Sequence, residues 1–319
     1  MLKKNKKQNT IILYDKKNDQ RIDNFLFNKY KKMSKNMIYS FIRKGVILIN
    51  KKKIKPKYKL KYLDKISINF ININKYLLIP KLIKLNKKLL SNISILYEDK
   101  YLLVLNKPAG IAVHGGSNLN YGIIELLRTT RPNSKFLELI HRLDKDTSGV
   151  LLIAKNHFTL CFLHNQFRLN KIKKIYLALI KGKFLFKKKV IIAPIGKSKL
   201  INNTRIVKID ANGKLSETHF MIKKCFSLAT LVYVKPITGR THQIRIHAKY
   251  MGHPIVLDNK YGDYKFNFKF EKLGIKRLFL HAKIICFKHP YYNKYINIRA
   301  PLDIFLDKCL NYLKKNYIL

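Results

Sequence analysis

Apolar residues near the N-terminus follow two short helical patterns. Ile22, Phe25 and Leu26 recur at a spacing of three to four residues. Asp23 lies near the start of this stretch, where a carboxylate complements the helix dipole. A second apolar run over 37–42 has the same spacing. These stretches predict two short amphipathic helices.

The residues around the second pattern predict where the helix begins and ends. Ser34 precedes the pattern as an N-cap residue, and Gly45 ends it. Apolar residues over 46–49 and 61–70 then predict two strands, with a turn at 50–51 between them. Two short helices and a small sheet would form one compact basic domain.

The longer remainder of the chain mixes strand and helix patterns and shows no internal repeat. The pattern predicts strands at 95–97, 102–105, 150–154, 174–180 and 229–234, and helices at 158–167 and 240–250. Because strands and helices do not alternate regularly, we expect an α+β fold. The predicted organisation is a basic tail at 1–18, a compact basic domain at 19–75, a Lys- and Leu-rich linker at 76–92, and a long domain at 93–319.

Charge changes this picture by predicting a polyanionic partner. The chain has 67 Lys and Arg against 17 Asp and Glu, a net charge of +50. Cations that neutralise phosphates release condensed counterions, so nucleic acid is the leading partner. Codon bias in an AT-rich genome would also enrich Lys, so charge alone does not prove this function. Arginine is rarer, and Arg142, Arg240 and Arg245 fall in the two most distinctive motifs.

Cysteine usage and hydropathy predict a cytoplasmic protein. The four Cys residues are widely spaced and form no Cys-x-x-Cys pair, which disfavours a zinc site and a disulfide framework. The longest charge-free stretches fall well short of the length that crosses a membrane. We therefore expect reduced thiols and no membrane contact.

Residues 141–149 read His-Arg-Leu-Asp-Lys-Asp-Thr-Ser-Gly and lead directly into the buried strand predicted at 150–154. Two of the scarce acids, Asp144 and Asp146, lie in this loop. A polar loop that feeds a buried strand can hold one carboxylate rigidly. Asp146 directly precedes Thr-Ser-Gly and fits a turn-forming role. Asp144 is the candidate catalytic carboxylate, although an Asp in such a loop is also an ordinary turn or cap residue.

Residues 238–247 place basic and polar side chains behind a tight glycine turn. Arg240, His242 and Gln243 could reach a phosphate or a base, and the N-terminus of the predicted helix offers unpaired N–H groups. The alternative is a solvated basic helix. A metal site that adds His247 and His253 is weak, because no nearby carboxylate or Cys completes the set.

Tyr176 alternates with apolar residues in a predicted strand, over 174–180. A strand tyrosine most often packs in a core or on a sheet surface. The alternative is stacking on a nucleobase, which contributes about 1–3 kcal/mol per base.

Several motifs follow one another in fixed order along the long domain. They are Asn106-Lys107-Pro108-Ala109-Gly110 with Val113-His114-Gly115, His141-Arg142-Leu143-Asp144 with Thr147-Ser148-Gly149, Tyr176, the run 238–245, Gly252-His253-Pro254-Ile255, and Leu280-His281-Ala282. In order and spacing this set resembles the RluA-type pseudouridine synthases. The resemblance covers about residues 90–300 and implies a mixed β-sheet core with flanking helices.

The compact basic domain also resembles a known module. Its motifs are Arg21-Ile22-Asp23-Asn24-Phe25-Leu26, Lys35-Asn36-Met37-Ile38-Tyr39, Arg43-Lys44-Gly45 and the run 50–60. These residues resemble the S4 (α-L-like) RNA-binding domain. Asn36 stands where the S4 domain usually has Ser, and Leu257-Asp258 stands where Gly-Asp is common in the synthases.

The resemblance implies that the chain converts specific uridines of 23S ribosomal RNA to pseudouridine, without a metal or an organic cofactor. Asp144 would be the catalytic carboxylate, which attacks C1′, adds to C6 or removes the 2′ proton. Arg245 would pair with Asp144 and favour its ionised form. Tyr176 would stack on the uracil and assist proton removal at C5.

The same resemblance assigns residues to RNA binding and base flipping. Arg142, two residues before the catalytic carboxylate, would fill the gap that the flipped base leaves. The other expected RNA contacts are His141, Arg240 and Lys107 in the long domain, and Arg43, Lys44 and Lys52 in the S4 domain. We expect a monomer with 23S ribosomal RNA as its partner.

Other functions remain open at this level. A non-catalytic ribosomal RNA-binding or ribosome-assembly protein could keep the fold and lose the reaction, although intact Asp144, Tyr176 and Arg245 disfavour this. A synthase that acts on transfer RNA or on other large-subunit sites would share the same motifs. A DNA-binding regulator is disfavoured, because the N-terminal domain offers no evident recognition helix.

Overall fold

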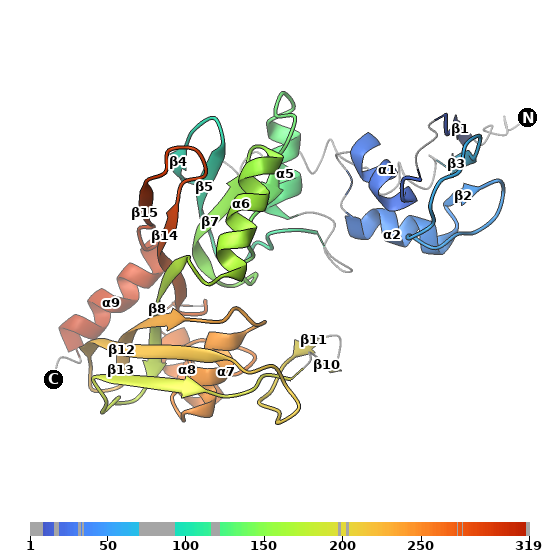
Figure 1. Ribbon diagram of the computed structural model, residues 1–319. Helices are drawn as coiled ribbons and strands as arrows, with labels where there is room; N and C mark the ends of the chain where they lie inside the picture. The colour runs from blue at the N-terminus through green and yellow to red at the C-terminus, as the bar shows by residue number, and fades with distance from the viewer. Residues whose placement is uncertain are drawn as a thin grey trace, which may run out of the picture. The chain divides into compact units, whose positions relative to one another are not determined.

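The computed structural model describes residues 9–15, 19–30, 33, 35–69, 93–115, 122–196, 199–201, 204–272, 274–275 and 277–316. Contacts divide the chain into two compact units. The N-terminal unit comprises Met1–Asn92 and His114–Lys135, and the C-terminal unit comprises Ile93–Val113 and Phe136–Leu319. Figure 1 shows the elements of each unit. The linker predicted at 76–92 lies outside the described residues.

The N-terminal unit contains the predicted helices, α1 (Ile22–Lys29) and α2 (Lys35–Lys44), and an antiparallel sheet of order β1-β3-β2. Its strands are β1 (Asn9–Leu13), β2 (Ile47–Ile49) and β3 (Lys65–Asn69). One apolar cluster joins the two helices to the sheet. This arrangement gives the basic domain a core of its own.

Strand β1 differs from the sequence prediction, which placed its residues in a basic tail. Residues 9–13 pair along the whole of β3, and the next residue, Tyr14, is buried. Strand β3 is also shorter than the predicted 61–70. The Asp64 carboxylate accepts hydrogen bonds from the Lys61 backbone and from Tyr58, so residues 61–64 form a turn.

Helix α5 (Ile123–Thr130) belongs by its contacts to the N-terminal unit. The Arg128 guanidinium of α5 lies 5.1 Å from the ring centroid of Phe27, which belongs to α1. The sequence predicts a single boundary near residue 92, whereas the contacts group 114–135 with the residues before that boundary. A cation–aromatic contact between segments about a hundred residues apart is not visible in local patterns.

A mixed sheet forms the centre of the C-terminal unit, and within the described residues its path is β4-β5-β7-β14-β8-β13-β12-β9. β6 pairs with β7, β15 pairs with β14, and β10 and β11 form a separate hairpin. The pair β7–β14 is parallel and the others are antiparallel, which confirms the α+β prediction. The strands are β4 (Ile95–Glu98), β5 (Leu102–Lys107), β6 (Glu138–Leu139), β7 (Ser148–Ala154), β8 (Lys173–Lys181), β9 (Lys188–Ile192), β10 (Lys199–Ile201), β11 (Thr204–Ile206), β12 (Glu217–Cys225), β13 (Ala229–Pro236), β14 (Leu280–Lys288) and β15 (Tyr295–Arg299).

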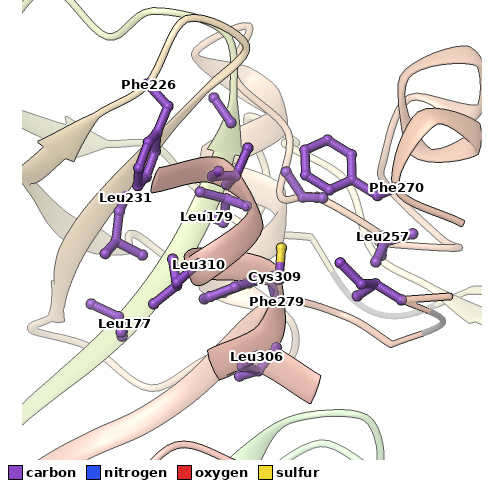
Figure 2. Close-up of a cluster of buried hydrophobic side chains, with 14 of the residues drawn as sticks. Leu177, Leu179, Phe226, Leu231, Leu257, Phe270, Phe279, Leu306, Cys309 and Leu310 are labelled. Atoms are coloured by element: carbon purple, nitrogen blue, oxygen red, sulfur yellow. The ribbon is translucent and has the colours of Figure 1, made fainter. Parts of the chain in front are cut away.

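Helices cover this sheet and close its cores. They are α6 (His157–Arg168), α7 (Gln243–Tyr250), α8 (Tyr264–Glu271) and α9 (Ile304–Asn316). Figure 2 shows one core, where Leu306 and Leu310 of α9 meet Leu177 and Leu179 of β8. None of the described helices is long and apolar enough to cross a bilayer.

The contact between β7 and β14 is so close that it requires a glycine. Gly149 has φ 111°, and a Cβ placed on it would lie 2.2 Å from the Ala282 carbonyl oxygen. Every residue of β7 is buried, as its continuous apolar run predicts. This rigid central strand begins four residues after Asp144, so the predicted catalytic loop is anchored to the middle of the sheet.

Candidate active site

Asp144 lies in the loop that leads into β7, with its carboxylate 30% exposed. The Thr147 amide donates to the Asp144 carbonyl oxygen (3.2 Å), which forms the turn that the sequence predicts after Asp144. The Gly110 amide donates to the Lys145 carbonyl oxygen (2.9 Å), so a second loop braces the first. The carboxylate is therefore held on a short, cross-linked loop and stays open to solvent.

Lys107, predicted to contact RNA, has a structural role instead. Its side chain is completely buried at the end of β5, and burial lowers the pKa of its ammonium to about 7. The ammonium donates hydrogen bonds to the carbonyl oxygens of Pro108, Ile111 and Lys145, at 2.7–2.9 Å. The RNA contact is a wrong prediction, because this ammonium joins two loops and does not face solvent.

Arg245 brings a second charge to Asp144 from helix α7. Its Nη1 lies 3.6 Å from Asp144 Oδ2, which confirms the predicted proximity. The stronger partner is Asp258, which accepts from Nε (2.8 Å) and Nη2 (2.6 Å). Burial by itself lowers the pKa of Arg245, but the hydrogen bonds and charge of Asp258 outweigh it and raise the pKa. The guanidinium is thus a fixed cation with one nitrogen directed at Asp144.

Asp258 is a residue of this site that the sequence reading did not single out. Its side chain is buried, and Oδ1 also accepts from the amides of Lys260 and Tyr261. The preceding Leu257 has φ 60°, in the left-handed region that favours glycine. The sequence did contain a signal for this turn. The family commonly has glycine before this Asp, and glycine is the residue that favours a positive φ.

Helix α7 begins at Gln243, three residues later than the sequence predicts. His242 has φ 54° and breaks the helical geometry before it. The Gln243 amide group bonds Thr238 (2.7 Å) and Thr218 (2.9 Å) and is buried, so it does not reach RNA. Arg240 precedes the helix and is exposed. The predicted phosphate-binding helix end is therefore correct only in placing an exposed arginine there.

His242 and Tyr261 close one side of the site. The Val207 amide donates to the Tyr261 hydroxyl (3.1 Å), and this hydroxyl can donate to His242 Nδ1 at 2.7 Å. That bond leaves the ring proton on Nε2, which lies 3.8 Å from Asp144 Oδ2. Burial lowers the pKa of His242, against the opposing effect of Asp144. A neutral histidine N–H thus faces the carboxylate.

Tyr176 lies on β8, next to Ala282 of β14 and Val234 of β13. Burial raises the pKa of its phenol, and the charge of Asp144 raises the pKa further. Ala282 also pairs with Gly149 at the start of β7, so Tyr176 lies one strand away from the strand that follows the Asp144 loop. Asp144, Arg245 and Tyr176, which are far apart in the sequence, are therefore brought together.

His141 and Arg142 have different environments although they are adjacent. His141 Nε2 accepts the Leu152 amide proton (3.1 Å), and burial lowers the pKa of His141 to about 3. The imidazole is therefore neutral and holds the loop against β7, which leaves it no charge for the predicted RNA contact. Arg142 is exposed, as expected for a residue that contacts RNA.

A second buried network fixes the start of β7. Arg277 Nη2 donates to Ser148 Oγ (2.9 Å), and the Ser148 hydroxyl can donate to His281 Nδ1 (2.8 Å). Arg277 also pairs with Asp303, at the start of α9. This network explains the Leu-His-Ala motif as structural. Arg277 was missed because its partners are distant in sequence.

The histidine metal site is not supported. His247 bonds the Thr218 hydroxyl through Nδ1 (2.9 Å) and the Ala193 carbonyl oxygen through Nε2 (3.3 Å). His253 Nδ1 bonds the Lys181 carbonyl oxygen (2.8 Å). In the part of the chain that the structure describes, no group of three His, Cys, Asp or Glu side chains could hold a metal ion.

The expected RNA contacts of the N-terminal unit lie on its surface. Arg43 and Lys44 form the last turn of α2, and Lys52 lies just after β2. All three side chains are exposed. The geometry is therefore consistent with phosphate contacts at one end of α2.

Comparison with known families gives the class of this protein as an RNA-modifying enzyme. A family profile described as RNA pseudouridylate synthase matches residues 101–250, and the S4 domain profile matches residues 20–64. The chain belongs to the RNA pseudouridylate synthase family. The match at 20–64 confirms the predicted S4 domain.

Relatives and solved structures agree with this assignment. The ribosomal large subunit pseudouridine synthase C of Pasteurella multocida is 49% identical over 93% of this chain and 91% of its own length. The protein of the same name from Escherichia coli K12 is 47% identical, over 92% and 93%. Human RNA pseudouridylate synthase domain containing 4 matches with TM-score 0.59 and 26% identity, over 73% of this chain and 97% of its own. Domain containing 1 matches with TM-score 0.57 and 26% identity, over 70% and 95%.

Proposed function

We propose that this protein isomerises specific uridines of the 23S RNA of the large ribosomal subunit to pseudouridine, as a cytoplasmic monomer. The names of its relatives supply the substrate class, and the S4 domain supplies a second RNA-binding surface. One observation carries the proposal. The Asp144 carboxylate faces Nη1 of Arg245, while Nε and Nη2 of the same guanidinium are bound by Asp258.

In the proposed reaction Asp144 acts as the catalytic carboxylate. The C1′–N1 glycosidic bond breaks, the uracil rotates, and a new bond joins C1′ to C5, from which a proton is lost. Attack at C1′, addition to C6 and removal of the 2′ proton all require ionised Asp144. The Arg245 guanidinium and the His242 Nε2 both face Asp144 Oδ2, at 3.6 Å and 3.8 Å.

We assign Tyr176 a stacking role. Its raised pKa keeps the phenol protonated at neutral pH, so its oxygen is a poor acceptor for the C5 proton. The ring is carried by the central strand β8, next to Ala282 of β14, and a flipped uracil would stack on it. This assignment favours stacking over the proton removal that the family resemblance also suggested.

The remaining residues would bring the RNA to the site. Exposed Arg142 lies two residues before Asp144 and would fill the gap behind the flipped base. Exposed Arg240 would contact a phosphate near the same loop. Arg43 and Lys44 of the S4 domain would add phosphate affinity that does not depend on sequence.

The test is to map pseudouridines in the 23S RNA of a strain that lacks the gene. Complementation with the wild-type protein should restore the missing pseudouridines, and complementation with Asp144→Asn should restore none. Asp146→Asn, which changes the other acid of the loop in the same way, is the matched control and should restore them. If the deletion removes no pseudouridine from 23S RNA but removes one from transfer RNA, the substrate assignment is wrong.

A further inference from the structure

A cluster of aromatic side chains lies at the end of the central sheet that is remote from Asp144. It comprises Tyr101, Phe158, Tyr291 and Tyr292, which we call the aromatic platform. Tyr101 follows the β4–β5 turn, Phe158 begins α6, and the other two lie in the β14–β15 turn. These turns adjoin the last residues of β7, because Leu102 pairs with Ala154 and the Lys155 amide donates to the Tyr101 carbonyl oxygen.

The platform is therefore well separated from the reacting base. Strand β7 has seven residues and Asp144 precedes its first one. At a rise of about 3.3 Å per residue, the strand alone spans about 20 Å. Figure 1 shows β4 and β15 gathered at this end of the C-terminal unit. A small substrate could not touch both places, whereas an RNA could.

The rings contact one another in fixed geometry. Tyr101 and Tyr291 stack with centroids 3.6 Å apart, and Phe158 meets Tyr291 edge-on at 5.2 Å. Tyr292 stacks on the imidazole of His289, with centroids 4.2 Å apart and planes 9° apart. The Asn156 side chain donates to the Tyr291 hydroxyl, which joins the turn to the start of α6.

A buried polar network holds the two turns that carry these rings. The Tyr291 and Tyr292 amides donate to His289 Nδ1, so His289 Nε2 carries the proton and donates to Asp99 Oδ2 (2.9 Å). Asp99 Oδ1 also accepts from the Tyr101 amide (2.7 Å). The His289 side chain is completely buried. Hydrogen bonds through His289 and Asp99 thus join the β4–β5 turn to the β14–β15 turn and fix the positions of the aromatic rings.

The rings nevertheless remain open to solvent. Phe158 is 53% exposed, Tyr291 43% and Tyr292 51%. Single exposed aromatic residues are common on protein surfaces, whereas a contiguous exposed cluster marks an interaction site. Two such rings in a turn held by hydrogen bonds, next to a third at the start of α6, indicate a binding surface.

The charge around the rings favours an anionic partner. The Lys100 ammonium lies 5.8 Å from the Tyr101 ring centroid, and Lys294 is exposed in the β14–β15 turn. Of the nearby acids, Asp99 is held by the buried histidine and Glu98 pairs with Lys155 (2.9 Å). Exposed π-faces flanked by cations suit unpaired nucleotides, whose bases stack while their phosphates meet the lysines.

We propose that the aromatic platform is a second RNA-binding surface of the C-terminal unit, which stacks an unpaired nucleobase of the substrate RNA at a distance from the reacting uridine. This inference rests on the proposed RNA substrate. The bound base would help to select the RNA segment, because the rigid sheet sets its separation from Asp144. The S4 domain contributes phosphate contacts instead.

The test measures the affinity of the full chain for a fluorescently labelled, single-stranded RNA oligonucleotide over a range of salt concentrations. Tyr292→Ala should weaken binding about five-fold or more at every salt concentration, because stacking is lost and no charge changes. Tyr292→Phe should restore the affinity. Lys100→Ala should instead reduce the slope of log Kd against log salt by about 0.7. Tyr264→Ala, which removes a 78%-exposed ring from α8, is the matched control and should bind as the wild type does.

Photo-crosslinking to RNA that contains 5-bromouridine gives an independent measurement. The wild type should crosslink within the peptide that carries residues 291–292. Unchanged RNA affinity in Tyr292→Ala, without a crosslink there, would overturn the platform proposal and point to a protein partner for these rings. That failure is distinct from a failure of the proposed function, because the wild type would still form pseudouridine.

Discussion

Arg245 and Asp258 form a buried, two-pronged ion pair, with Nε to Oδ2 at 2.8 Å and Nη2 to Oδ1 at 2.6 Å. The pair leaves Nη1 directed at Asp144, 3.6 Å away. Asp258 therefore sets the orientation of the cation that faces the proposed catalytic carboxylate. Asp258 is a positioning residue, because it acts on Asp144 only by orienting Arg245.

The first prediction concerns this positioning. Asp258→Asn replaces one acceptor by a donor, so Arg245 loses a hydrogen bond and its orientation. We expect kcat for pseudouridine formation to fall about ten-fold or more with KM little changed, because RNA binding does not involve Asp258. Breaking a buried pair should also lower the free energy of unfolding by about 3–5 kcal/mol. Steady-state kinetics at a temperature where the variant is folded separates the two effects.

A matched control for this variant is Asp263→Asn, which removes a carboxylate that caps α8 and pairs with Lys181. This control should lose little stability and retain kcat, because Asn caps a helix about as well as Asp does and the pair with Lys181 is exposed to solvent. A fall in kcat of the same size in both variants would show that Asp258 acts only through general stability.

The second prediction concerns the close contact of β7 and β14. Gly149→Ala introduces a Cβ into the Ala282 backbone at a φ that side chains rarely adopt. We expect a loss of about 3 kcal/mol or more in the free energy of unfolding, measured by urea denaturation. Gly239→Ala, whose Cβ would meet nothing within 4 Å, should change stability by about 0.5 kcal/mol at most. Equal effects of the two substitutions would contradict the assigned geometry.

The third prediction concerns Leu257, a buried side chain at φ 60°. Both Leu257→Ala and Leu257→Gly should destabilise, by about 2–5 kcal/mol for the lost burial. The Gly variant should be the more stable of the two by about 1 kcal/mol, because it removes the left-handed strain that Ala keeps. At Leu179 in β8 the order should reverse, since glycine weakens an ordinary strand position. Thermal unfolding gives the order of stability of the Ala and Gly variants. The same order at Leu257 and at Leu179 would contradict backbone strain at Leu257.

The fourth prediction is a pH dependence from His141. Its folded pKa of about 3 lies below the ordinary value because the surrounding protein desolvates the half-buried ring. As pH falls below about 6.5, the unfolded chain therefore binds a proton that the folded chain does not, and the free energy of unfolding falls by up to about 1.4 kcal/mol per pH unit.

His141→Gln cannot take up this proton and should show a shallower decline in stability between pH 6.5 and 4. His164→Gln, which replaces an exposed histidine of α6, is the control and should follow the wild-type curve. Urea denaturation at a series of pH values makes the measurement. Parallel curves for the wild type and His141→Gln would contradict a desolvated, neutral His141.

Features that local patterns determine were predictable from the sequence. The continuous apolar run of β7 predicts a strand buried on both faces, and it is one. Helix α6 follows its predicted period, with Asn156 as a side-chain cap. The loop at Asp144 is recognisable because acids are scarce in this chain.

Features that depend on distant contacts were not predictable. Lys107 looks like a surface lysine at the end of a strand, and only the folded loops provide the carbonyl oxygens that bury its ammonium. Strand β1 requires a partner more than fifty residues away. The Asp258–Arg245 pair joins a turn to helix α7, and an ion pair between separate elements leaves no period in the sequence.

The central claim, that Asp144 catalyses uridine isomerisation in ribosomal RNA, is tested most directly by tritium release. The substrate is a 23S RNA transcript labelled with tritium at C5 of uridine, and formation of the C1′–C5 bond displaces the label into water. The wild type should release tritium, and Asp144→Asn should release none while it binds the RNA within a few-fold of wild-type affinity. Release by Asp144→Asn at a rate near that of the wild type would contradict the account.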